Sequence, residues 1–118
     1  MSDAIIHIVR RRATPAMMSE RLQSLGSYVK LAVDVRREVL AGGGELHADC
    51  EQALLEDGSR QEDIWGADWP PSSQKVQFEA PINIRPRQNN PGMTIQDPAI
   101  RARVEAIARQ LLEGVMTE

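Results

Sequence analysis

The residues best suited to chemistry gather in the middle of the chain, between Leu46 and Gly66. This stretch combines a histidine with several carboxylates, a serine, a glutamine and a tryptophan. The candidates for ligand binding in it are His47, Asp49, Ser59, Gln61, Asp63 and Trp65. Their spacing matches no catalytic motif of known mechanism, so the sequence leaves open the reaction, any cofactor, and whether the protein is an enzyme at all.

A second polar group lies further along the chain, where the candidates are Asn83, Arg85 and Asn89. Asn83 and Arg85 are two residues apart, so an extended strand would project both from one face. An arginine beside amides at a strand end suits a carboxylate or a phosphate. The alternative, which the sequence slightly favours, is an ion pair from Arg85 to Asp34, to Glu79 or to the acidic stretch 45–68.

A metal site is one hypothesis for the first group. His47 and Glu51 are four residues apart and share a helical face, whereas Asp49 points away from it. A histidine with carboxylates, completed by a distant ligand such as Asp63 or His7, suits zinc or manganese. The spacing lacks the specificity of H-E-x-x-H, so a histidine that bonds across a helix–sheet junction is the favoured alternative, and no metal ligand is assigned.

Three other residues have structural alternatives. Ser59 has no adjacent base and no G-x-S-x-G around it, so a role in a helix-ending turn is favoured over nucleophilic catalysis. Cys50 falls among the apolar helix positions, which favours a buried, inert thiol. Trp65 fits a ligand platform and the hydrophobic core about equally well.

Patterns of apolar residues predict the elements that position these side chains. Strands are expected over residues 4–9, 29–35, 38–43, 64–69 and 76–84, and helices over 15–25, 45–56 and from 98 to Gly114. Thr14-Pro15 and Asp97-Pro98 are typical helix starts. Pro81 lies inside the last strand, where it cannot donate to a ladder, so this strand is expected at an edge or a bulge.

The predicted order is β-α-β-β-α-β-β-α, which indicates an α+β fold with a mostly antiparallel sheet and helices packed on one face. The 118 residues are expected to form a single domain, 1–118, with a largely aliphatic core. One-sided cover would leave a polar sheet face open, and such a face suits self-association. We therefore expect a homodimer. The residues of that face are Lys30, Asp34, Gln77, Glu79, Asn83 and Arg85.

The charge distribution narrows the choice of partner. The net charge is −3, and the stretch from Glu45 to Asp68 holds eight acidic residues and one arginine. A nucleic-acid partner is not favoured, because Trp65 lies in this acidic stretch and Trp69 directly follows it. No apolar run approaches a membrane span and no secretory signal opens the chain, so a cytoplasmic protein without a membrane partner is expected.

Three blocks carry a resemblance to a known group of proteins. They are LAGGGELHAD at 40–49, DGSRQEDIWG at 57–66 and INIRP at 82–86, the last followed by Asn89 and Asp97. The chain resembles, from Ile6 to Leu112, a family of small uncharacterised bacterial proteins that is frequent in cyanobacteria. The resemblance implies a stand-alone domain and no particular activity. Pro81 departs from the family pattern, which puts the pairing of its strand in doubt.

Two functions follow from these observations. The first is a non-catalytic binding or regulatory module that acts as a homodimer and engages a protein or a small acidic ligand. The alternative is a small metal-assisted hydrolase or nuclease-like enzyme acting on a phosphorylated substrate, with His47 as base or metal ligand, Asp49 and Asp63 holding the metal, and Arg85 stabilising negative charge. The alternative requires five side chains to converge in one pocket, those of His47, Asp63, Trp65, Asn83 and Arg85.

Overall fold

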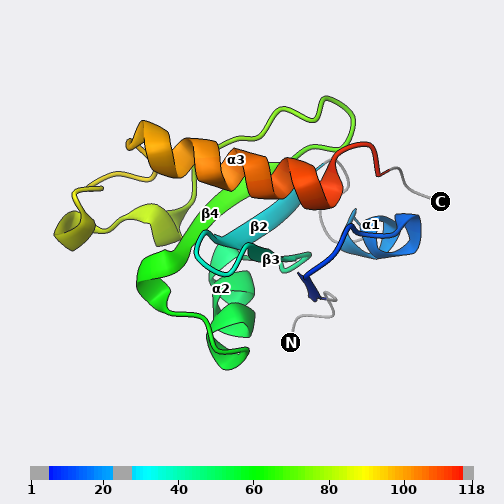
Figure 1. Ribbon diagram of the computed structural model, residues 1–118, viewed down its shortest axis with the longest axis horizontal. Coiled ribbons are helices and arrows are strands. Elements are labelled where there is room, and N and C mark those ends of the chain that lie inside the picture. The colour runs from blue at the N-terminus through cyan, green and yellow to red at the C-terminus, as the bar shows by residue number, and fades with distance from the viewer. Residues whose placement is uncertain (1–5, 23–27, 116–118) are drawn as a thin grey trace.

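The computed structural model describes residues 6–22 and 28–115, and within them it forms a four-stranded antiparallel sheet with three α-helices (Figure 1). The strands, in the spatial order β1-β3-β2-β4, are β1 (His7–Val9), β2 (Val29–Asp34), β3 (Val39–Gly42) and β4 (Ile64–Trp69). The helices are α1 (Pro15–Leu22), α2 (His47–Glu56) and α3 (Pro98–Leu112). Three 3-10 helices are η1 (Gln61–Asp63), η2 (Pro81–Asn83) and η3 (Pro86–Gln88). The α+β class is confirmed.

Helices cover both faces of the sheet, which corrects the expectation of one-sided cover. Leu31 and Val33 of β2 belong to the main core together with side chains of α3, which runs across the sheet in Figure 1. Ala32, on the opposite face of β2, belongs to a second cluster with Cys50 and Leu54 of α2. The small side chain of Ala32 leaves room for α2, so the sheet face expected to be open is partly covered.

The connection between β2 and β3 is longer than the expected two-residue turn at Arg36 and Arg37. Asp34 accepts hydrogen bonds at Oδ1 from the backbone N–H groups of both arginines, at 2.9 and 2.8 Å. Glu38 then adopts a left-handed conformation with φ 58°, so the returning strand begins one residue later than expected, at Val39. The turn therefore depends on a buried aspartate that satisfies two backbone donors.

The expected strand over 76–84 is wrong. Residues 76–80 form only isolated bridges, Asp68 to Gln77 and Glu79 to Thr94, and Pro81 begins η2 instead of continuing a ladder. The apolar alternation is real, because Ala80 is buried and Phe78 packs on the main core. Proline lacks the N–H that a continuous strand needs, and the chain turns at that point.

The sequence correctly predicted where α1 and α3 begin. Thr14 Oγ1 accepts from Met17 N–H at 3.2 Å, and Asp97 Oδ1 accepts from Ala99 N–H at 2.8 Å, which confirms both predicted caps. The predicted residues 4–5 and 23–25 of the first strand and helix lie outside the described residues.

Throughout the described ranges, every helix is too short or too polar to cross a lipid bilayer.

Gly66 permits the closest approach between β4 and the segment that follows it. A Cβ atom at this position would lie 2.5 Å from the Ala80 Cβ and 2.9 Å from the Ile82 Cγ1. Real Cβ atoms do not approach other atoms so closely. The Ala80 Cβ is bonded to the backbone and the Ile82 Cγ1 is only one bond further out, so neither atom can move aside as the end of a long side chain would. The glycine is therefore what brings residues 80–82 against the sheet.

We predict that Gly66→Ala lowers the free energy of unfolding by about 1–3 kcal/mol, because it forces two packed segments apart. Urea denaturation followed by circular dichroism measures the change. Gly92→Ala is the matched control, since a Cβ there would meet nothing within 4 Å. Equal stability of the two variants would contradict the close approach at Gly66.

Candidate functional site

Two hollows lie side by side on the α2 face of the sheet and share Pro81 and Ile82 in their walls. The larger, here the Arg85 cleft, has a volume of about 490 Å³ and is bounded by Glu51, Gln61, Pro81, Ile82 and residues 84–88. The smaller, here the His47 pocket, has a volume of about 210 Å³ and is bounded by Lys30, residues 46–48, Pro81 and Ile82. His47 and Arg85 thus line separate hollows on the same side of the sheet.

Arg85 is held rigidly in the wall of its cleft. Its Nε donates to the Ile82 carbonyl at 3.0 Å and its Nη2 donates to Glu51 Oε2 at 3.1 Å. The guanidinium also lies 4.9 Å from the centre of the Trp65 ring. Burial lowers the pKa of Arg85, and Glu51 opposes that shift. An arginine stays charged under such a change, so the site holds a buried cation with its counter-ion.

Trp65 and Glu51 settle two questions that the sequence left open. Trp65 is 2% exposed and belongs to the main core, so it supports Arg85 and is not itself a platform for a ligand. The ion pair expected for Arg85 exists, and its partner is Glu51 within the acidic stretch. Glu51 was considered only as a possible metal ligand beside His47, four residues before it, and was not predicted as the particular partner of Arg85.

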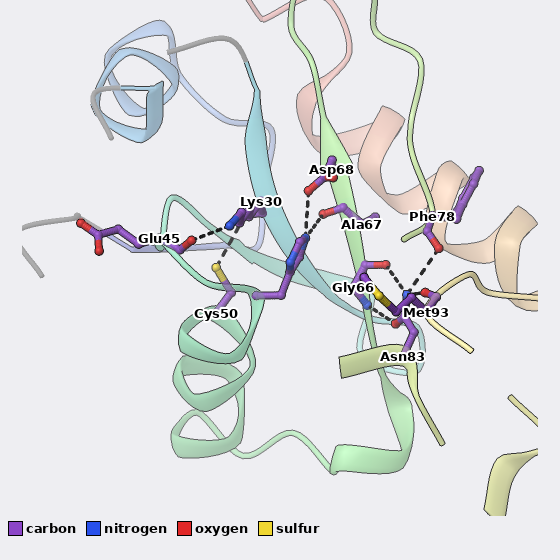
Figure 2. A network of polar contacts seen from close by, with 10 residues as sticks. Lys30, Glu45, Cys50, Gly66, Ala67, Asp68, Phe78, Asn83 and Met93 are labelled. Atoms are coloured by element: carbon purple, nitrogen blue, oxygen red, sulfur yellow. Dashed lines mark hydrogen bonds and ion pairs between the residues drawn. The ribbon is translucent and has the colours of Figure 1, made fainter. Parts of the chain in front are cut away.

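The Asn83 side chain is a structural element of the sheet edge (Figure 2). Its Oδ1 accepts from the Gly66 N–H at 2.7 Å, and its Nδ2 donates to the carbonyls of Gly66 at 3.0 Å and Met93 at 3.1 Å. Asn83 is fully buried and its amide groups are occupied within the chain. It therefore positions the wall of the cleft and is not available to a ligand.

Asn90, which sequence reasoning missed, continues this network. Its Nδ2 donates to the carbonyls of Asn83, Gly92 and Thr94 at 2.8, 3.1 and 3.0 Å, and its Oδ1 accepts from the Gln96 N–H at 2.9 Å. The predicted candidate Asn89 is exposed, and it ends η3 in a left-handed conformation with φ 61°. Nothing in the local sequence distinguishes the two neighbouring asparagines before the fold is known.

His47 is the first residue of α2, and its side chain bonds to β4. Figure 2 labels the two β4 residues that it contacts, Ala67 and Asp68. Its Nε2 lies 2.8 Å from Asp68 Oδ1 and 3.1 Å from the Ala67 carbonyl oxygen. This is the helix–sheet bond that the sequence favoured for His47. Asp68 was not a candidate, but it follows Gly66 by two positions and therefore points to the same face of β4.

The other carboxylate candidates are engaged elsewhere. Asp49 accepts from the Leu46 N–H at 3.3 Å and so helps to begin α2. Asp63 forms an ion pair with Arg36 at 3.0 Å. No group of three or more histidine, cysteine, aspartate or glutamate side chains in the described part of the chain is arranged to hold a metal ion. The convergence that the hydrolase alternative requires is not found.

Ser59 belongs to an ionic network at the end of α2. Its Oγ accepts from Arg37 Nη1 at 2.7 Å, and Asp57 accepts from Arg37 at 2.7 Å and from both terminal nitrogens of Arg10 at 2.8 and 2.6 Å. Hydrogen bonds from Arg10 and Arg37 hold the pKa of the Asp57 carboxyl well below its usual range. Ser59 is thus part of the scaffold, as its helix-ending position indicated.

Comparison with known proteins identifies the family but no activity. Residues 7–111 match the model of a family described as "Protein of unknown function (DUF5674)", and the chain belongs to that family. This agrees with the resemblance to an uncharacterised family; the individual sequence blocks and a bacterial source stay predictions. A search of curated proteins and a search of solved structures each found no match.

We predict that Asp57→Asn lowers stability at neutral pH and that the difference from the unchanged protein shrinks as the pH falls below about 4. The pKa of Asp57 is depressed in the folded state, so its stabilising effect is complete above the unfolded pKa of about 4 and is lost on acidification. Urea denaturation at a series of pH values measures this. The neighbouring Glu56→Gln serves as control, and a difference for Asp57→Asn that did not vary with pH would contradict the prediction.

Proposed function

We propose that this chain is a non-catalytic binding module that holds a small carboxylate-bearing ligand in the Arg85 cleft. The observation that carries the proposal is a buried guanidinium in the wall of an open hollow, fixed by Trp65 and Glu51. A cation held in one orientation binds a planar carboxylate at a lower entropic cost than a mobile one. The cleft is also within the volume range of ordinary small-molecule sites.

Arg85 retains donors for a ligand after its internal bonds are made. A guanidinium has five N–H groups. In Arg85 the Nε–H donates to the Ile82 carbonyl and one N–H of Nη2 donates to Glu51. One N–H of Nη1 donates to Gln88 Oε1 over a long 3.5 Å. One N–H remains on each terminal nitrogen, which is the arrangement that a carboxylate recognises.

The rim of the cleft adds charge and apolar surface. Arg87 lines the cleft and is exposed, and no ion pair is described for it within residues 6–22 and 28–115. Together Arg85 and Arg87 outweigh the single negative charge of Glu51 in the lining. Ile84, 48% exposed, gives an apolar wall beside them. A ligand with a carboxylate on a short apolar body matches these contacts, and an acidic peptide end would present the same chemistry.

The module is further proposed to act in the cytoplasm as a homodimer. A chain with a single cysteine, Cys50, suits a reducing compartment. The polar sheet face that suggested self-association is partly covered by α2, so this face does not favour a dimer. Support now comes from β1, an edge strand whose described partner is β3 alone. A second β1 would pair with the side of β1 that faces away from β3, around a two-fold axis.

We predict that benzoate or glutarate changes the fluorescence of Trp65 in a saturable way, because the occupied cleft perturbs the guanidinium on that ring. The Trp69→Phe background isolates the signal. Arg87→Gln should weaken binding about 5- to 10-fold, in keeping with the loss of one charged contact. Arg60→Gln, which removes an exposed arginine outside the cleft lining, is the matched control. Unchanged fluorescence with both acids, or equal affinity of the two variants, would contradict the proposal.

We predict that the native mass by light scattering is twice the chain mass of 13.1 kDa at micromolar concentration. A mass of one chain that does not rise with concentration would contradict the dimer. That result would leave the ligand site unaffected, because every residue of the Arg85 cleft comes from one chain.

A further inference from the structure

The proton of the His47 ring is placed by its two partners. Asp68 Oδ1 and the Ala67 carbonyl oxygen are both acceptors, and both lie within hydrogen-bond distance of Nε2. Nε2 must therefore carry the proton and donate. In the neutral ring the other nitrogen, Nδ1, is then an acceptor. Asp68 fixes both the orientation of the imidazole and the identity of its basic nitrogen.

Nδ1 is left for a ligand. Among the described residues, no hydrogen bond to Nδ1 occurs. The buried side-chain atoms without a partner there are Asp34 Oδ2 and Trp69 Nε1, so Nδ1 is not sealed inside the protein. His47 lines the smaller pocket, whereas Asp68 lines a different hollow with Tyr28 and Gln77. His47 thus lines the pocket while its Nε2 is directed to Asp68 and Ala67, so Nδ1 is the ring nitrogen that remains for a ligand in the pocket.

Lys30 supplies the charge of this pocket. Its Nζ donates to the Glu45 carbonyl at 2.7 Å, as Figure 2 shows, which fixes the side chain and leaves two of the three ammonium protons. The rest of the lining is Leu46, Ala48, Pro81 and Ile82, so Lys30 is its charged member. Leu46 is 58% exposed, which is unusual for a leucine and gives the pocket an apolar lip.

We propose that the His47 pocket is a second binding site, for a small 2-hydroxy acid. The carboxylate of such a ligand would bind Lys30, its hydroxyl would donate to His47 Nδ1, and a short aliphatic chain would lie against Pro81 and Ile82. The volume of about 210 Å³ is below the usual range for drug-sized ligands and suits a molecule of a few heavy atoms. This site is independent of the Arg85 cleft in every polar contact.

The test is an NMR titration of the full ¹⁵N-labelled chain at pH 8 with lactate and 2-hydroxybutyrate, each compared with propionate or butyrate. The hydroxy acids should produce saturable shifts at His47 Nδ1 and at the Ala48 amide. They should also bind about 5-fold more tightly than the acids that lack the hydroxyl, as expected for one hydrogen bond. Lys30→Met should weaken hydroxy-acid binding by about 10-fold or more.

Lys75→Met is the matched control, because it replaces the second lysine of the chain, which is exposed and outside the pocket lining. The amide spectrum of each variant reports whether it is folded, and Arg87→Gln should leave the titration unchanged. The proposal is overturned if Nδ1 does not shift, if the hydroxy and plain acids bind equally, or if a folded Lys30→Met binds like the unchanged protein.

Discussion

The side-chain amide of Asn83 does for the edge of β4 what a neighbouring strand would otherwise do. It accepts the Gly66 N–H and donates to the Gly66 carbonyl, so one side chain satisfies both polar groups of an edge peptide. Both hollows depend on this pairing, because it fixes the segment from Ala80 to Arg85 that forms their shared wall. The amide is buried, and a buried polar group left without partners costs about 1–3 kcal/mol, so the segment is strongly specified.

The same pairing explains why polar residues gather on the α2 face without forming one site. Arg85 follows Asn83 by two residues, and its side chain bonds to Glu51. Glu51 lies on α2, four residues after His47. His47 is directed to β4 by Asp68, on the other side of Ile82. Arg85 and His47 thus have different partners, and the shared apolar wall keeps the two hollows separate. A buried pair of this kind is costly to break on one side, which favours a rigid scaffold around each hollow.

The part of the fold that sequence reasoning predicted is the part set by local physics. The strand Ile64–Trp69 and the start of α3 were predicted correctly, because a short, mainly apolar run and the Asp97-Pro98 cap act over a few residues. The run from Val76 to Ile84 alternates as a strand does, yet it meets the edge of β4 only through the Asp68–Gln77 bridge and the side chain of Asn83, and not through a continuous ladder. Ala32 lies between Lys30 and Asp34 on its face of β2, and this pattern likewise gave no sign that α2 would cover it. The partners Glu51 and Asp68 are set by tertiary contacts, which a one-dimensional pattern does not contain.

The most direct test of this account is native-state hydrogen exchange of the Gly66 amide. Its N–H points away from β2 and has the Asn83 oxygen as its partner, so the account predicts protection in the unchanged protein. Asn83→Ala should reduce that protection more than 10-fold relative to Ala67, whose amide lies on the β2 side by strand alternation. A Gly66 amide that exchanges freely in the unchanged protein, or one whose protection survives in Asn83→Ala, would contradict the account.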